Sequence, residues 1–418
     1  MCIRISSILA LWLTGGAIFL AIDERAQAIT IDTVPIGNSG NAADTADGNN
    51  ARAGVQHYGA VAYNYRIGKY DVTVGQYTAF LNAVAATDTY DLYNPKMATD
   101  LNVAGIGRSG APGSYTYSVI GSPNHAVTYV SWYDAARFCN WLQNGQPGLN
   151  GPSVQQDNSS TEDGAYSLLG YNDLYVYRNH GAKWAVPSVD EWYKAAYYDP
   201  AAGHYWTYAT GSNTAPTWAP PGNTPTAANF ATDSGLYAAT GAPYNNSQNY
   251  LTDVGAYAAS PSPYGTFDQG GNVWQWTQTF VSGASGYRAA RGGAWEDRSF
   301  FLSSIYEYDA GGGWEERGIG FRLVNLPSAG DYNQDGIVDA ADYTVWRDGL
   351  DGAYRQADYD AWKNNFGTVV GSGAASSPGA STPEPATWAT LLIGLIAIVG
   401  ASLQPKLVVT PSPCQRCG

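Results

Sequence analysis

Three short segments decide the fold of this chain: Gly271-Asn272-Val273-Trp274-Gln275-Trp276, Arg291-Gly292-Gly293-Ala294-Trp295 and Gly320-Phe321-Arg322. They lie in a long region, residues 29–327, in which glycine, tyrosine and tryptophan are spread throughout and extended apolar runs are few. A region of this length can form one irregular domain. We therefore expect short strands and long loops around these segments, including a loop-like stretch from Gly148 to Gly164.

Three earlier segments precede them in chain order: Tyr65 to Thr73 (YRIGKYDVT), Val127 to Ala135 (VTYVSWYDA) and Trp184 to Trp192 (WAVPSVDEW). The six segments together resemble the signature of the formylglycine-generating enzyme, or sulfatase-modifying factor, family. The resemblance implies the fold of that family, an α+β domain of low regular secondary structure that is related to the C-type lectin fold.

Three helices are expected from apolar periodicity. Val74 to Ala85 and Ser131 to Leu142 each place apolar residues three and four positions apart, which is typical of an amphipathic helix. Ser131 is a candidate N-cap with Asp134 at the capping-box position. A third helix runs from about Val189 to Tyr197. The buried faces of the first two are predicted to comprise Tyr77, Phe80, Leu81, Val84, Ala135, Phe138, Cys139 and Leu142.

The resembled family owes its activity to two cysteines that follow a Gly-Gly-Ser-Tyr/Trp turn. They bind copper and activate oxygen to convert a sulfatase cysteine to formylglycine, and soft Cu(I) prefers sulfur ligands. In this chain the corresponding stretch, Glu296 to Leu302 (EDRSFFL), contains no cysteine, and Cys139 lies in a predicted helix far away in sequence. The sequence therefore predicts no catalytic residue of the family type.

An enzyme with different metal chemistry on the same scaffold is the alternative, with Glu296, Asp297 and Arg298 as its candidate groups. Ordinary solvated acids are the competing interpretation of Glu296 and Asp297. The four histidines occur singly, without HxH or HxxxH spacing, which argues against a non-heme iron site.

A structural calcium site of the family is implied beside the Gly271–Trp276 segment. The matching positions are Asp268, Gly271, Val273 and Gln275, where Gln275 replaces the glutamate of the family and Asp268 supplies the remaining carboxylate. Calcium prefers such oxygen ligands. A tryptophan-rich core turn without metal is the alternative.

A second calcium site is predicted in Asp331 to Asp342 (DYNQDGIVDAAD), which matches the EF-hand loop pattern. Oxygens at loop positions 1, 3, 5, 7, 9 and 12 converge on the ion, and a glycine at position 6 allows the chain to reverse. The helix expected from Tyr343 to Leu350, and a second helix around Gln356 to Trp362, make residues 328–368 resemble a dockerin module, whose partner is a cohesin. A polar turn without metal is the alternative. The predicted ligands are Asp331, Asn333, Asp335, Ile337, Asp339 and Asp342.

The two ends of the chain predict export and anchoring. Residues 1–28 have the charge, apolar core and small-x-small pattern of a signal peptide, with an uncleaved anchor as the alternative. A Gly/Ser/Pro linker, residues 369–385, ends in Pro-Glu-Pro, and an apolar helix long enough to span a bilayer follows at residues 386–403, before a tail at 404–418. This arrangement resembles the PEP-CTERM sorting signal, which implies exosortase-type sorting machinery as a partner; a plain membrane anchor is the alternative.

The composition limits the possible partners. The net charge is −14 with 13% charged residues, and no basic stripe exists to neutralise phosphates, so nucleic acid is excluded as a natural partner. The chain has 32 Tyr and 14 Trp, and such amphipathic side chains suit contact with a polar, neutral ligand such as a glycan or a protein. The sequence thus predicts an exported cell-envelope protein whose large domain is a non-catalytic, calcium-stabilised binding or structural module.

Overall fold

The computed structural model describes residues 28–45, 57–168, 175–179, 181–281, 286–327, 330–333, 337–348 and 356–368. Most of the predicted signal peptide and all of the Pro-Glu-Pro linker, the apolar helix and the tail lie outside these residues. Within the described ranges, no helix combines the length and the apolar character that a bilayer span requires.

One sheet joins the two ends of the large domain. Its order is β1 (Thr33–Ile36), β2 (Tyr65–Gly68), β16 (Val324–Asn325) and β5 (Trp184–Ala185), and all neighbours are antiparallel. Ile67 of β2 pairs with Val34 on one side and with Val324 on the other. The end of the domain is therefore hydrogen-bonded to its first strands, which closes the fold.

A second, mixed sheet carries the three segments that decide the fold. Its order is β14 (Tyr308–Gly311), β13 (Tyr287–Arg291), β12 (Trp274–Phe280) and β15 (Ile319–Gly320). β12 is antiparallel to β13 and parallel to β15, with Gln275 opposite Gly320. This pairing places the Gly271–Trp276 segment directly beside Gly320-Phe321-Arg322.

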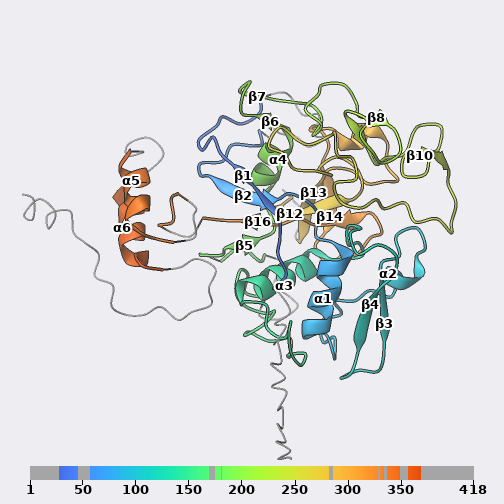
Figure 1. The fold of residues 1–418 in the computed structure, drawn as a ribbon, viewed down its shortest axis with the longest axis horizontal. Coiled ribbons are helices and arrows are strands. Elements are labelled where there is room, and N and C mark those ends of the chain that lie inside the picture. Colours follow the sequence, from blue (N-terminus) through green and yellow to red (C-terminus); the bar gives the residue numbers. More distant parts are fainter. Residues whose placement is uncertain are drawn as a thin grey trace, which may run out of the picture.

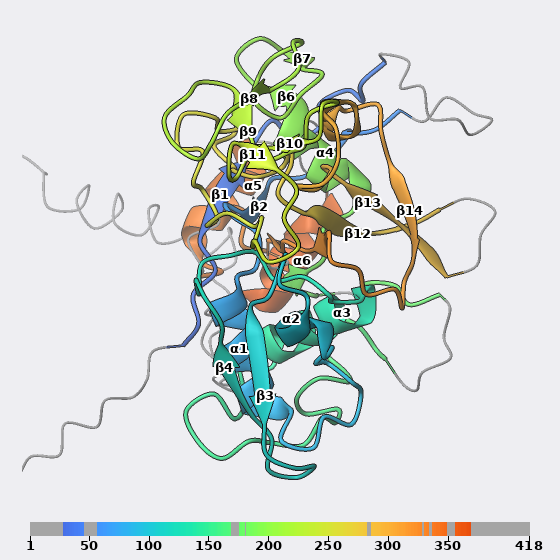
Figure 2. The ribbon, with the colours of Figure 1, turned by 90° about the vertical axis from the view of Figure 1, so that its right-hand side faces the viewer.

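The three predicted helices are present: α1 (Val74–Val84), α3 (Trp132–Gln143) and α4 (Val189–Tyr197). Each begins at a capping box, in which a serine or threonine and the side chain three residues later bond to each other's backbone N–H groups. The predicted Ser131–Asp134 capping box is confirmed. In Figures 1 and 2 the sheets lie between the helix pair α1–α3 on one side and α4 with the short strands β6 to β11 on the other.

The remaining elements of the large domain are short and lie in loops at its periphery. Their small size agrees with the low regular content expected from the sequence. They are α2 (Lys96–Thr99), η1 (Ser299–Leu302), and the pairs β3 (Ile106–Ser109) with β4 (Thr116–Val119), β6 (Tyr198–Asp199) with β7 (His204–Tyr205), β8 (Thr217–Trp218) with β9 (Ala227–Ala228), and β10 (Leu236–Tyr237) with β11 (Ala242–Pro243).

Aromatic side chains form the centre of the core. Phe138 of α3 contacts Phe80 of α1 with ring centroids 5.2 Å apart and Phe321 at 5.5 Å, both edge to face. Pairs of this kind contribute roughly 0.5–1.5 kcal/mol beyond the area that they bury. The predicted helix faces are buried as expected, but Trp132 and Trp141 are buried too, so α3 is surrounded by protein on nearly all sides.

Residues 330–368 contain two packed helices, α5 (Ala340–Asp348) and α6 (Gln356–Asn365). The helix expected from Tyr343 begins earlier, at Ala340, because the Asp339 carboxylate accepts a hydrogen bond from the backbone N–H of Ala341 at 2.7 Å and so caps the helix. Rings join the two helices: Tyr343 lies 5.2 Å from Trp362, and Trp346 lies 5.0 Å from Tyr359.

Candidate functional site

The side chain of Gln275 connects three of the signature segments. Its Oε1 accepts hydrogen bonds from the Trp192 indole and from Nε of Arg322, both at 2.6 Å, and its Nε2 donates to the carbonyl oxygen of Asp268 at 2.7 Å. Gln275 is fully buried. All of its hydrogen-bonding groups are thus used inside the protein, as a buried carboxamide requires.

Arg322 extends this network to the first signature segment. Its guanidinium donates to the carbonyl oxygens of Gly68 and Phe267 and to Oδ1 of Asp71. Burial raises the pKa of Asp71 to about 8, although Arg322 acts in the opposite direction. Within the described ranges, the second oxygen of Asp71 accepts no hydrogen bond.

The other two signature segments join the same turn. The Trp276 indole donates to the carbonyl oxygen of Val130 at 2.9 Å, and the N–H of Gly271 donates to the carbonyl oxygen of Gly292 at 2.8 Å. Gly271 has a φ of +90°, and a Cβ there would lie 2.4 Å from the carbonyl oxygen of Asn229, so only glycine fits. The six segments therefore hold each other in place, which is a structural role.

The predicted calcium residues of this turn, Asp268, Gly271, Val273 and Gln275, are brought together, but Gln275 turns its oxygen away from Asp268. The half-buried Asp268 carboxylate accepts a hydrogen bond from the N–H of Gly255 at 2.6 Å, and loss of solvent contact raises its pKa to about 6. A calcium ion would need the Gln275 carboxamide to leave Trp192 and Arg322. Calcium at this turn stays a prediction.

The stretch from Glu296 to Leu302, where the resembled family has its two cysteines, contains no thiol. Leu302 is fully buried and packs with Ala228 and Phe230 in a small apolar cluster. The Asp297 carboxylate accepts a hydrogen bond from the N–H of Ala294 at 2.9 Å, and burial raises its pKa to about 6. Cys139, the free cysteine of the described residues, is buried in α3, and burial raises the pKa of its thiol.

A pocket of about 230 Å³ opens beside this stretch. At its rim Glu296 is paired with Arg317, and the exposed side chains of Arg298 and Asp233 are paired at 2.8 Å. The pocket is lined by Ala231, Thr232, Asp233, Gly235, Tyr237, Glu296, Asp297, Arg298 and Phe301.

Aromatic rings continue from this pocket to the surface. Trp295 stacks on Tyr250 with centroids 4.9 Å apart, Tyr250 stacks on Tyr244, and the outermost ring, Tyr244, is 48% exposed. The guanidinium of Arg317 lies 5.4 Å from the Trp295 ring on the same side of the domain. Sequence analysis missed Tyr244, Tyr250 and Arg317, because only the fold brings them to Trp295.

In the predicted EF-hand loop, Asp342 is fully buried and accepts hydrogen bonds from the N–H groups of Asn333 at 2.9 Å and Asp339 at 2.8 Å. Asp331 is also buried, whereas Ile337 is 42% exposed. Asp335 lies outside the described residues. Calcium binding by this loop stays a prediction. Among the described residues, no three acidic, histidine or cysteine side chains are grouped so that they could hold a metal ion.

Comparison with known proteins gives one family match. The model of the sulfatase-modifying factor enzyme 1-like domain matches residues 22–326. Similar solved structures include CarF (20% identity, 71% of this chain and 98% of that chain covered, TM-score 0.42) and Treponema denticola variable protein 1 (18%, 71% and 95%, 0.41). PvdO from Pseudomonas aeruginosa is similar at 16% identity, with 71% and 92% covered and a TM-score of 0.36. No curated protein matches the chain.

Proposed function

The chain belongs to the family of sulfatase-modifying factor enzyme 1-like domains, and we propose that its large domain, residues 29–327, is a non-catalytic member of that family. In this proposal the domain acts as a calcium-stabilised binding or structural module of the cell envelope. One observation carries the proposal: the stretch from Glu296 to Leu302 has no thiol.

The packing of this stretch supports the proposal. Copper chemistry of the family type needs two thiolates, because Cu(I) binds sulfur in preference to oxygen. Leu302 is instead part of an apolar cluster, and Asp297 is half-buried and hydrogen-bonded to the backbone of Ala294. Cys139 is the free cysteine of the described residues and is buried in α3, and one thiol cannot supply the two that this chemistry needs.

An enzyme with other metal chemistry is the second candidate, and its groups are Glu296, Asp297 and Arg298. Glu296 is paired with Arg317, Arg298 is paired with Asp233, and Asp297 accepts a backbone hydrogen bond. These pairings reduce the negative charge that would attract a hard metal ion. They favour the binding module over the enzyme.

The surface beside this stretch suits recognition of a glycan or a peptide. The exposed ring of Tyr244 offers an apolar face, the buried rings of Tyr250 and Trp295 support it from behind, and Glu296 and Arg317 at the rim offer hydrogen bonds. Rigid aromatic side chains beside polar groups are typical of such binding surfaces.

The remaining parts of the chain complete the proposal. Residues 328–368 would form a dockerin-like calcium module, a role that the buried carboxylates of Asp331 and Asp342 support. The signal peptide would direct export. The Pro-Glu-Pro motif and residues 386–403 would anchor the protein at the cell surface through exosortase-type machinery.

Metal analysis and a glycan array on the purified full chain test this function together. We expect calcium without stoichiometric copper or iron, and saturable, calcium-dependent retention of a glycan that Tyr244→Ala weakens. Tyr175→Ala, which removes another tyrosine of similar exposure (49% against 48%), is the matched control and should bind normally. Stoichiometric copper or iron in the chain would favour the enzyme instead.

A further inference from the structure

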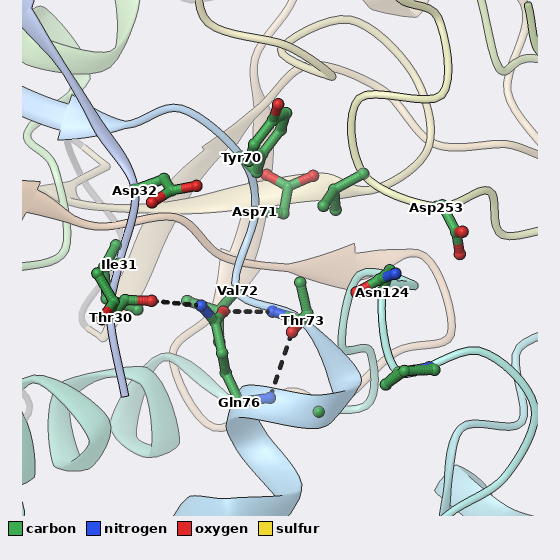
Figure 3. Close-up of a pocket in the computed structure, with 13 residues that line it drawn as sticks. Thr30, Ile31, Asp32, Tyr70, Asp71, Val72, Thr73, Gln76, Asn124 and Asp253 are labelled. Carbon is green, nitrogen blue, oxygen red and sulfur yellow. Dashed lines mark hydrogen bonds between the residues drawn. The ribbon is translucent and has the colours of Figure 1, made fainter. Parts of the chain in front are cut away.

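A second and larger pocket, of about 550 Å³, lies where α1 begins (Figure 3). It shares no lining residue with the pocket beside Glu296 to Leu302. Its walls come from residues 30–32, 70–73, 75–76, 123–124 and 253–254, so the segment that precedes β1, the turn before α1, the first turn of α1 and two loops meet there. The volume falls within the range of pockets that hold small ligands.

The backbone donors at this end of α1 are already used. The N–H groups of Val74 and Gly75 donate to carbonyl oxygens of the 123–125 segment, each at 2.8 Å. The N–H of Gln76 donates to the Thr73 hydroxyl at 3.2 Å, and the Gln76 carboxamide accepts from the N–H of Thr73 at 2.9 Å. A free helix N-terminus attracts anions, but this one has no spare donor among those N–H groups.

The pocket instead offers acceptors. The carboxylates of Asp32 and Asp253 are exposed at its rim, and Figure 3 shows them on opposite sides of Asp71. Asp71 lies behind them, and its second oxygen accepts no hydrogen bond from the residues that the structure describes. Asp253 already accepts a hydrogen bond from the Ser122 hydroxyl at 2.5 Å, which leaves its other oxygen for a ligand.

The neighbouring cations do not balance these acids. The Lys69 ammonium lies over the Tyr70 ring, 5.3 Å from its centroid, and the Arg322 guanidinium is buried behind the pocket, where it donates to Oδ1 of Asp71 at 2.9 Å. The His125 imidazole lies 3.7 Å from Asp253, and burial lowers the pKa of His125, which favours its neutral form. The exposed carboxylates of Asp32 and Asp253 therefore give the rim an excess of negative charge.

We propose that this pocket binds an organic cation that carries a guanidinium or ammonium group. Such a group donates several hydrogen bonds at once, which matches a pocket that presents separated acceptors. Within the described residues the acids are not grouped closely enough to hold a metal ion, which favours an extended organic cation over calcium here. The cation could be a free amine or an arginine side chain of a peptide.

Isothermal titration of the purified full chain tests this proposal. The probes are agmatine, the peptide Ac-Gly-Arg-Gly-amide, and the same peptide with neutral, isosteric citrulline. We expect one or both cations to bind and the citrulline peptide to bind at least about tenfold more weakly; which cation binds identifies the source. Asp32→Asn and Asp253→Asn should each weaken binding roughly three- to fivefold, the effect of an exposed charge pair.

Asp348→Asn is the matched control, because it removes an exposed aspartate charge in α5, outside the pocket lining, and should leave affinity unchanged. Thermal melting of each variant checks the fold. Equal affinity for the arginine and citrulline peptides, no binding of either cation, or unchanged affinity in both pocket variants would overturn the proposal. So would a calcium response that Asp32→Asn and Asp253→Asn abolish, because the pocket would then be a metal site. The outcome does not depend on whether the large domain is catalytic.

Discussion

Replacing Gln275 by glutamate tests the network that joins the signature segments, because it restores the acid of the resembled family. Oε1 would keep its bonds from Trp192 and Arg322, and the new charge would strengthen the bond to the guanidinium. The other oxygen, however, would replace an N–H donor that lies 2.7 Å from the carbonyl oxygen of Asp268. Two acceptors would then face each other in a buried site.

The net change in the free energy of unfolding follows from these opposing contributions. Leaving buried polar groups unsatisfied costs about 1–3 kcal/mol, and the stronger bond to Arg322 offsets part of this cost. We therefore expect Gln275→Glu without calcium to be about 1–2 kcal/mol less stable than the parent chain. Calcium that binds the new carboxylate together with Asp268 would return about 2.7 kcal/mol at a hundredfold excess over its dissociation constant.

Urea unfolding in EDTA and in excess calcium measures both effects. Gln278→Glu is the matched control: it makes the same charge change on the same strand, at a half-buried position whose carboxamide accepts a hydrogen bond from Tyr166. We expect the control to respond to calcium no more than the parent does. A Gln275→Glu chain that is as stable as the parent in EDTA, and whose stability does not change with calcium, would refute this description of the network.

Three further predictions concern single buried side chains. Arg322→Ala should lower the free energy of unfolding by about 2–4 kcal/mol in urea, because it leaves Oδ1 of Asp71 and the carbonyl oxygens of Gly68 and Phe267 without their donor; a loss below about 1 kcal/mol would contradict this network. Asp342→Asn should abolish the calcium heat of the 328–368 loop in titration calorimetry, since it removes a buried carboxylate of that loop; an unchanged heat would place calcium elsewhere. Burial raises the pKa of Asp134 to about 7, so the folded chain holds a proton that the unfolded chain releases, and stability should fall, on the order of 2 kcal/mol, as pH rises from about 4 to about 7. The Asp134→Asn side chain can still accept the hydrogen bond from the N–H of Ser131. Melting curves of this variant should show a smaller change of stability with pH than those of the parent chain; an equal change would mean that other acids cause it.

Local patterns in the sequence were sufficient to predict the three helices of the large domain. The caps at Thr73, Ser131 and Ser188 bond to residues only three positions away, so the pattern that specifies each helix start is contained in four residues. The predicted starts of α1, α3 and α4 are correct to within one residue for this reason, whereas α5 begins three residues before the predicted Tyr343. The family resemblance, in turn, identified the six segments that meet around Gln275.

Long-range partners could not be read from the sequence. Arg137 and Glu162 form a buried ion pair, with Nε 2.8 Å from Oε1, and so anchor the stretch from Gly148 to Gly164 that the sequence predicts only as a loop. The strands β5 and β16 have two residues each, too few for an alternating pattern. These contacts depend on where the fold brings distant segments, which no local pattern encodes.

The candidate sites also differ in whether the sequence alone could predict them. The loop from Asp331 to Asp342 could be proposed as a calcium site because all its predicted ligands follow each other at fixed spacing, and calcium binding there stays a prediction. The pocket that includes Asp32 and Asp253 was missed, since its walls come from four separate parts of the chain. Residue spacing in the sequence predicts a site whose residues all lie in one loop. It does not predict a site whose residues come from separate segments that the fold brings together.

The central claim is that the large domain lacks the chemistry of its family, and peptide oxidation tests it most directly. The purified full chain is incubated with copper, oxygen, a reductant and a CxPxR peptide, beside a family enzyme that has both cysteines. The peptide mass is then measured. The account predicts that the peptide cysteine stays unoxidised with this chain while the reference enzyme converts it. Formylglycine formed above the copper-only blank by this chain would contradict the account.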